Sequence, residues 1–338
     1  MSGISISGDS IPLIYAVMGS NVSEAEELLD KGADINEKNH EGFTALIWAS
    51  RNRDRDMVKM LLLRDANINE KDSISGIGFT ALMWAFKNKD WGIIKLLLDY
   101  KASLVEKDSN GCTVLHHACK NGYKDVVEFL MDQGANIHEK DRYGDTAFHI
   151  AIINGHRDVV ELLLDSSADI HYKDSGGNNA LHAASYHGCK DVVELLLERG
   201  ANIHDKNNIG YNALINVSHT KHIDVARLLI VRGAHIHEKD CDGNTAIHYA
   251  SSFGQRDMTE LLMDHGADIN DKDNYGYNSL HSACIEGHWD VIELLLERGA
   301  NINEKNNDGN TALVLALRKG REDIVELLEA KNKEMVEL

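Results

Sequence analysis

Histidine is the residue type in this chain that most strongly suggests chemistry, because imidazole binds zinc and transfers protons near neutral pH. The chain of 338 residues contains 18 histidines. One set, the arm histidines, recurs every 33 residues at His138, His171, His204 and His237. A second set, the capping histidines, falls on multiples of the same interval at His116, His149, His182, His248 and His281. If each interval is one structural unit, equivalent histidines lie ~10 Å apart and cannot share a zinc ion whose ligands lie ~2 Å away. This spacing favours structural roles.

The densest group of ligand-type side chains is Cys112, His116, His117 and Cys119. On a helix His116 and Cys119 share a face, which is the alternative that a metal site requires. Cys119 and Cys284, however, stand where the other units carry small core residues, so we expect packing thiols. The chain has no glycine-rich phosphate loop and no G-x-S-x-G or H-E-x-x-H motif. The sequence therefore predicts no enzyme, no cofactor and no metal.

A repeating pattern organises the whole chain. Segments such as Thr146-Ala147-Phe148-His149 and Thr245-Ala246-Ile247-His248 begin each unit. The ten starting positions are 11, 44, 80, 113, 146, 179, 212, 245, 278 and 311. Every step is 33 residues except the one from 44 to 80, which is 36. Three additional residues therefore fall within 73–77.

Each unit predicts the same elements in the same order. A threonine or asparagine that can cap a helix is followed by a short helix, such as residues 147–154. A glycine turn leads to a second helix with an apolar face, such as residues 158–164. Glycine and alanine end this helix, as at Gly134-Ala135. An extended arm and a turn such as residues 141–144 complete the unit.

These residues resemble the ankyrin repeat, with its G-x-T-P-L-H-x-A-A, G-H-x-x-V-V-x-L-L-L and G-A-D-I-N segments. The resemblance covers residues 9–330 and implies an all-α solenoid of helix-turn-helix units with protruding β-hairpin-like loops. The family's proline appears only as Pro12, and alanine, a strong helix former, replaces it in most copies. We expect a flexible segment over 1–8, a single domain over 9–330 whose first and last repeats are caps, and a tail over 331–338.

Two irregularities interrupt the pattern. The enlarged loop at 73–77 carries Ile74 and Ile77, which we expect to pack locally rather than to contact a partner. In the seventh repeat Lys221 stands where glycine is expected. A left-handed lysine would cost ~1 kcal/mol, so this repeat is interpreted either as a soft joint or as a neutral departure.

The resemblance also indicates where a partner would bind. In ankyrin proteins the turn tips and the exposed side of the first helix line a concave groove, and their side chains vary. The candidate partner-binding residues at such positions are Phe43, Trp48, Phe79, Trp84, His117, Tyr143, Ile150, Tyr211, Tyr249 and Tyr277. Trp48 and Trp84 occupy equivalent positions in adjacent repeats. They form either an exposed apolar patch, which we favour, or a set that packs internally and on the enlarged loop.

Charge narrows the classes of partner. The formal net charge of −19 repels phosphate backbones, so nucleic acid is not expected, and a basic or amphipathic peptide is. The five widely spaced cysteines indicate no disulfide framework. With no signal-peptide pattern and no apolar run of ~18 residues, we expect no membrane contact and a cytoplasmic location; a nuclear or secreted-effector location stays open.

The sequence therefore predicts a non-enzymatic protein-interaction scaffold, with a monomer favoured. The alternatives are a self-associating structural module and a host-directed effector or adaptor. A third is suggested by Asn36, Asn69, Asn270 and Asn303, which resemble positions hydroxylated in some ankyrin proteins. Whether these arm residues are hydroxylated is not determined by the sequence.

Overall fold

A computed structural model describes residues 11–73 and 76–337, and over these residues all regular secondary structure is helical. Helices alternate between a first and a second helix of each repeat. The first helices are α1 Pro12–Met18, α3 Ala45–Arg51, α5 Ala81–Lys87, α7 Val114–Lys120, α9 Ala147–Ile153, α11 Ala180–Tyr186, α13 Ala213–Ser218, α15 Ala246–Ser252, α17 Ser279–Glu286 and α19 Ala312–Arg318. The second helices are α2 Val22–Asp30, α4 Arg55–Leu63, α6 Trp91–Asp99, α8 Lys124–Asp132, α10 Arg157–Asp165, α12 Lys190–Glu198, α14 Ile223–Val231, α16 Arg256–Asp264, α18 Trp289–Glu297 and α20 Glu322–Glu337. The all-α prediction and the helix pairing of every repeat are confirmed.

The chain forms two compact units. The first contains residues up to 151 together with 158–168, and the second contains residues 152–157 together with 169 onwards. The boundary thus passes through the fifth repeat, which carries α9 and α10. The single domain over 9–330 stays a prediction.

Short side-chain caps explain why the helices begin where they do. Thr44 Oγ1 accepts a hydrogen bond from the Ile47 amide at 3.3 Å and starts α3. Asp54 Oδ1 accepts from the Met57 amide at 3.1 Å and starts α4. Each cap satisfies one of the amides that a helix N-terminus leaves without an intrahelical partner. The same residue types therefore fix the helix starts along the chain.

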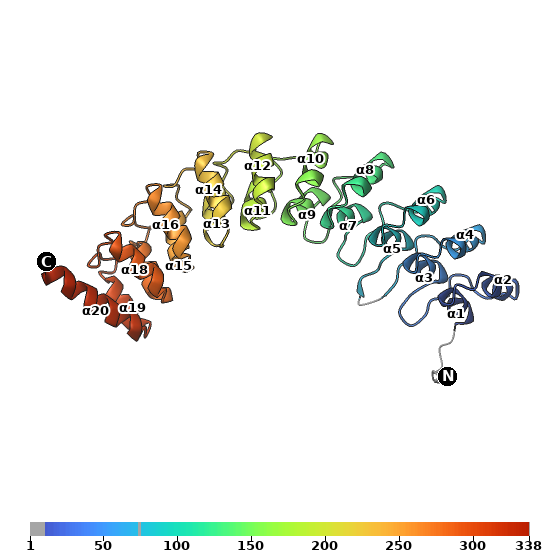
Figure 1. Ribbon diagram of the computed structural model, residues 1–338, viewed down its shortest axis with the longest axis horizontal. Coiled ribbons are helices and arrows are strands. Elements are labelled where there is room, and N and C mark those ends of the chain that lie inside the picture. Colours follow the sequence, from blue (N-terminus) through green and yellow to red (C-terminus); the bar gives the residue numbers. More distant parts are fainter. Residues whose placement is uncertain (1–10, 74–75, 338) are drawn as a thin grey trace. The chain divides into compact units, whose positions relative to one another are not determined.

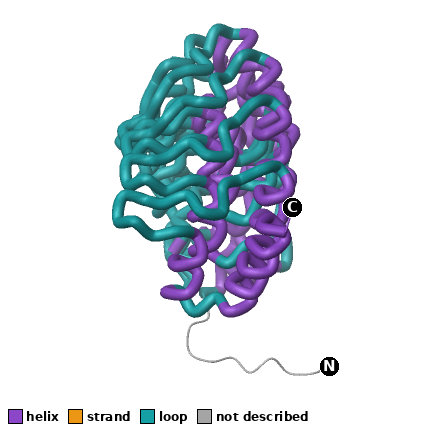
Figure 2. The backbone as a smooth tube through the Cα atoms, turned by 90° about the vertical axis from the view of Figure 1, so that its left-hand side faces the viewer, coloured by secondary structure: helices purple, strands orange, loops and turns teal. Residues whose placement is uncertain are grey.

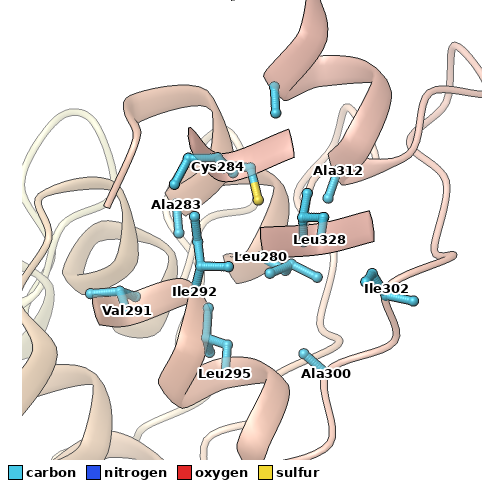
Figure 3. Packing of buried hydrophobic residues seen from close by; sticks show 12 residues of the cluster. Leu280, Ala283, Cys284, Val291, Ile292, Leu295, Ala300, Ile302, Ala312 and Leu328 are labelled. Carbon is cyan, nitrogen blue, oxygen red and sulfur yellow. The ribbon is translucent and has the colours of Figure 1, made fainter. Parts of the chain in front are cut away.

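Within each unit the helices form two rows, and the core lies between them. First helices pack on first helices of neighbouring repeats, as α3 does on α5 and α15 on α17, and second helices pack on second helices, as α4 does on α6. Figure 2 shows the loops running beside the stacked helices. The core at the C-terminal end is seen in Figure 3, where Cys284, Ile292 and Leu328 are at most 1% exposed and come from three different helices. No repeat could bury these side chains alone.

The loops that follow the second helices are hairpin-like turns organised by an aspartate or asparagine. In the turn at Asp141, the Asp141 amide donates to the Asp145 carbonyl at 2.9 Å, and Asp141 Oδ1 accepts from the amides of Tyr143 and Asp145. An isolated antiparallel bridge joins Lys140 to Thr146 beside this turn. Each tip is also bonded to the next, as when the Arg142 amide donates to the Asn110 carbonyl at 2.9 Å. The predicted hairpin-like loops are therefore present.

The left-handed strain that the sequence places at Lys221 is not there. Among the described residues, Lys221 does not have a positive φ, because helix α13 stops one residue early at Ser218 and the Thr220 amide bonds to the Val217 carbonyl. Left-handed non-glycine residues occupy the same turn in early repeats instead, including Arg53 with φ 62° and Lys89 with φ 54°. The expectation of a strained lysine was wrong, and the strain lies in the N-terminal repeats.

The two ends and the enlarged loop complete the comparison with the sequence. Residues 331–337, which the sequence assigns to a tail, continue helix α20, since alanine, lysine and glutamate favour helix. The expected flexible segment 1–8 and Ile74 lie outside the described residues. Ile77 is half-buried, and its carbonyl accepts the Ser109 amide at 2.8 Å. Of the helices over the described ranges, none has the length and apolar character needed to cross a membrane.

Candidate binding surface

The capping histidines are structural, as the sequence predicts. His248 Nδ1 accepts from the Thr245 amide at 3.1 Å and lies 2.9 Å from Thr245 Oγ1. Its Nε2 is 3.2 Å from the Tyr277 carbonyl of the next turn. His116 makes the equivalent contacts within its own unit. Burial lowers the pKa of both histidines and keeps the rings neutral. Each ring thus caps one helix and holds the neighbouring loop.

The group Cys112, His116, His117 and Cys119 is used for packing and for hydrogen bonding. Cys119 is fully buried, and burial strongly raises the pKa of its thiol. Burial, followed by the nearby Asp108 and Asp141, raises the pKa of Cys112 to about 12. Protonated thiols are poor metal ligands and nucleophiles. The packing interpretation of Cys119 agrees with this environment.

Five of the candidate residues are brought together as one aromatic cluster. The aromatic cluster consists of Phe43, Trp48, Phe79, Trp84 and His117, from the second to the fourth repeat. The ring centroids of Phe43 and Trp48 lie 4.9 Å apart, those of Phe79 and Trp84 5.4 Å, and those of Phe79 and His117 4.8 Å. Phe43 and Trp84 connect the two ends at 6.2 Å. The cluster is therefore continuous across three repeats.

The cluster has a buried layer and a partly exposed layer. Phe43 is fully buried and Phe79 is 7% exposed, whereas Trp48, Trp84 and His117 are half-buried. Both interpretations of these residues thus describe part of the cluster: the phenylalanines pack internally, and the other three rings reach the surface. A partner could contact Phe43 only through the rings that cover it.

Two cations lie against the exposed rings. The Arg51 guanidinium carbon is 5.0 Å from the ring centroid of Trp84 and 5.2 Å from that of Trp48. Lys87 Nζ is 4.7 Å from the Trp84 centroid and 5.6 Å from that of Phe79. Cations at these distances are attracted to the faces of aromatic rings. The surface of the cluster is accordingly mixed, with apolar rings and positive charge.

Turn aspartates orient the exposed rings. Asp72 Oδ1 accepts from the Phe79 amide, and its Oδ2 accepts from Trp84 Nε1 at 2.7 Å. Asp108 repeats the arrangement: its Oδ1 accepts from turn amides, and its Oδ2 lies 3.0 Å from His117 Nε2. Burial of Asp108 opposes ionisation, but bonds from His117 and the Cys112 amide outweigh burial and lower its pKa. One carboxylate thus shapes a turn and fixes a ring.

Trp48 lacks this bond because its turn carries an amide. Asn39 Oδ1 accepts from the amides of Glu41 and Phe43 at 3.0 and 2.9 Å. The remaining atom of the side chain is an NH₂ group, which can only donate. Trp48 Nε1 is therefore buried with no hydrogen-bond partner.

A hollow of about 310 Å³ adjoins the aromatic cluster. It lies beside helices α5 and α7, and its lining includes Ile77, Phe79, Phe86, Lys87, His117 and Tyr123. The sequence analysis included Phe79 and His117 in the candidate site but omitted Phe86, Lys87 and Tyr123. No sequence signal distinguishes Phe86 from other core positions, because the hollow is formed by several repeats together.

A second aromatic group lies in the second unit. The Tyr211 hydroxyl donates to the Tyr249 hydroxyl at 2.7 Å, and Tyr249 donates to Asp240 Oδ2 at 2.5 Å. The ring of His219 is 4.3 Å from that of Tyr249 and 5.2 Å from that of Phe253. Burial, together with the Asp240 bond, raises the pKa of Tyr249. Tyr249 thus repeats the ring-to-turn bond of Trp84 and His117.

The other three candidate residues lie apart from these groups. Tyr143 is at a turn tip and is 71% exposed, with the Arg142 guanidinium 4.7 Å from its ring centroid. Ile150 is half-buried on α9, and Tyr277 is half-buried with its ring 5.9 Å from His281. Neither Tyr143 nor Tyr277 has a ring contact with the aromatic cluster among the described interactions.

The arms carry a lysine ladder that sequence reasoning missed. Lys206 Nζ donates to the Lys239 carbonyl 33 residues ahead at 2.9 Å and pairs with Glu238 at 2.5 Å. Lys272 likewise donates to the Lys305 carbonyl and pairs with Glu304. Equivalent pairs occur in both units. The regular lysine at this position was a usable signal, since a residue that recurs in phase contacts its own neighbour.

Comparisons with known proteins agree with this architecture. The family profile described as ankyrin repeats (three copies) matches residues 5–72, 70–141, 133–207 and 202–273. Further ankyrin-repeat profiles match residues 262–316 and 308–334. The chain belongs to the ankyrin-repeat family, whose repeats are generally protein–protein interaction modules.

Similar proteins share only a segment with this chain. A mitochondrial disaggregase from Bos taurus is 35% identical over 106 residues, which is 31% of this chain and 16% of that protein. A probable E3 ubiquitin-protein ligase from Oryza sativa subsp. japonica is 39% identical over 69 residues, 20% of this chain and 13% of the ligase. Inversin from Mus musculus is 41% identical over 61 residues, 18% of this chain and 6% of inversin. In each case the chain spans less than a fifth of the relative.

Proposed function

We propose that the chain is a non-enzymatic protein-interaction module that binds a peptide segment of a partner protein at the aromatic cluster and its adjoining hollow. The observation that supports this most directly is the continuity of half-buried rings with a hollow of about 310 Å³. Aromatic side chains beside a pocket are typical of binding hot spots. The capping histidines support the non-enzymatic part, because His116 and His248 are engaged in caps.

The chemistry of the surface suggests the form of the ligand. The hollow is lined by Ile77, Phe79 and Phe86, so it suits a bulky apolar side chain as an anchor. The net charge of −19 attracts basic segments at long range, whereas Arg51 and Lys87 stand against the rings at contact range. We therefore infer an amphipathic peptide with an apolar anchor. The side that it meets is formed by turn tips and first helices, and five free cysteines suit a reducing compartment such as the cytoplasm.

The proposal is tested with a displayed library of random peptides. Peptides selected on the whole chain should carry a bulky apolar residue. They should bind at least about tenfold more weakly to Asn110→Trp and Lys87→Glu variants. Asn110 is exposed and lines the hollow, so tryptophan there obstructs its mouth; Lys87 is exposed at the rim.

Arg318→Glu is the matched control, because Arg318 is exposed at the equivalent end of α19 and lies outside the hollow. Selected peptides that bind all three variants as strongly as the original chain would place the binding surface elsewhere. Light scattering on the pure protein separates peptide binding from self-association.

A further inference from the structure

Two histidines and a glutamate meet between the arms of the sixth and seventh repeats, which are residues 201–206 and 234–239. His204 lies on the first arm, and His235 and Glu238 lie on the second. One ligand atom from each of these three side chains lies within 4.8 Å of the others, and they are the only such trio of histidine, cysteine or acidic residues among the described residues. The rings of His204 and His235 are 4.1 Å apart at their centroids. All three residues belong to the second unit.

The sequence analysis missed this pairing because it compared residues 33 apart. On the arms, a residue meets the one that follows it by 31. Asn36 Oδ1 accepts the Asn67 amide at 2.7 Å, and Asn270 Oδ1 accepts the Asn301 amide at 3.3 Å. His204 and His235 stand in this relation. The arm histidines are too far apart to share an ion with each other, but His204 reaches a histidine outside that set.

Residue 235 departs from the repeat pattern. The equivalent residues of the other arms are Asp34, Asn67, Ser103, Asn136, Asp169, Asn202, Asp268 and Asn301. An asparagine or aspartate here accepts a hydrogen bond from the amide two residues on, as Asn202 does from His204 and Asn301 from Asn303. Histidine at 235 replaces this local bond with a ring beside His204. The exchange gives up a turn-stabilising contact and places a second imidazole at the same point.

The polar atoms of the trio are available for a ligand. His204 Nδ1 is buried and has no hydrogen-bond partner. His235 Nδ1 and Glu238 Oε1 are 3.3 Å apart, which is about the separation of two ligands on a tetrahedral ion with bonds of ~2.0–2.1 Å. Lys206 pairs with the other carboxylate oxygen, Oε2, at 2.5 Å and orients the carboxylate. A side-chain rotation of His204 of about 1–2 Å would complete the set.

We propose that His204, His235 and Glu238 form a binding site for a divalent transition-metal ion such as Zn²⁺, which joins the arms of the sixth and seventh repeats. Two imidazoles and one carboxylate suit zinc or a similar ion. They do not suit Mg²⁺ or Ca²⁺, which take oxygen ligands. The remaining coordination position faces a solvent-open hollow that is also lined by His237 and His265. Bound metal would stabilise this junction, because it binds the folded arms and not the unfolded chain.

The test is calorimetric titration of the full chain with Zn²⁺ alone, beside the variant His235→Asn. Asparagine is the residue of the neighbouring arms, so this variant restores the ordinary turn and removes one ligand. We expect zinc affinity to fall by at least about tenfold. Zinc should raise the melting temperature of the original chain and leave that of His235→Asn unchanged. With a chelator present, His235→Asn should be at least as stable as the original chain.

His171→Ala is the matched control, since His171 occupies the same arm position one repeat earlier and faces Asn202 in the 31-residue relation. It should bind zinc as the original chain does. Cobalt(II) spectra should lack thiolate charge-transfer bands, which excludes the exposed Cys241 as a ligand. Equal zinc affinity of the original chain and His235→Asn, or no zinc uptake by either, overturns the proposal.

Discussion

At the scale of single residues, the turn carboxylates determine how the exposed aromatic rings are held. Asp72, Asp108 and Asp240 each shape a turn with Oδ1 and bond a ring with Oδ2. An aspartate can do both because an ionised carboxylate has two accepting oxygens. Asn39 has only one, so Trp48 Nε1 is left without a partner. The difference between the two residue types is therefore a difference in how rigidly a surface ring is held.

The first prediction concerns Asn39→Asp. The new Oδ2 should accept from Trp48 Nε1 and stabilise the folded chain by about 1 kcal/mol, because a buried donor gains a partner. The free energy of unfolding by urea, followed by tryptophan fluorescence, measures this. Asn306→Asp is the control: Leu315 stands where Trp48 does and offers no donor, so that variant should gain no stability. Equal gains in both variants would contradict the role assigned to Trp48.

At the scale of the element, the turn between the two helices of a repeat shows how the same fold tolerates different residues. Glycine at this turn adopts a positive φ, as Gly122 and Gly155 do. Arg53 and Lys89 adopt the same conformation with a side chain, which costs roughly 1–2 kcal/mol. The seventh repeat avoids the conformation by ending α13 early at Ser218. A shorter helix thus replaces strain at Lys221.

The second prediction therefore has opposite signs in two repeats. Arg53→Gly should stabilise the chain by about 0.5–1 kcal/mol, because glycine relieves a left-handed conformation. Lys221→Gly should destabilise it by a similar amount, since glycine there only increases the entropy of the unfolded chain. Thermal unfolding of both variants measures the two effects. If Lys221→Gly were stabilising, the rearranged turn described for the seventh repeat would be wrong.

At the scale of the whole molecule, stability comes from contacts between successive repeats. Backbone bonds join neighbouring turn tips, the lysine ladder joins neighbouring arms, and apolar side chains join neighbouring helices. Each interaction reaches only the adjacent repeat. Arrays of this kind behave as nearly one-dimensional systems, so damage in one place should remain local.

The third prediction tests this locality with Ile292→Ala. Ile292 is fully buried in the cluster at the C-terminal end, and its truncation should cost about 2–5 kcal/mol. Hydrogen exchange should become faster in α17–α20 and stay unchanged in α3–α8. A uniform increase in exchange along the chain would instead indicate that the array unfolds as one cooperative body.

The sequence by itself determined the repeating architecture, because capping threonines, turn glycines and apolar helix faces act within one repeat. It also predicted the role of capping histidines such as His248, whose main partner is three residues away. The tertiary structure decided what depends on neighbouring repeats: that Phe43 is buried, that Phe86 lines a hollow, and that His204 meets His235. Pattern reasoning compares equivalent positions, whereas packing brings non-equivalent positions together. The 31-residue offset between arms follows from the backbone path and not from the 33-residue period.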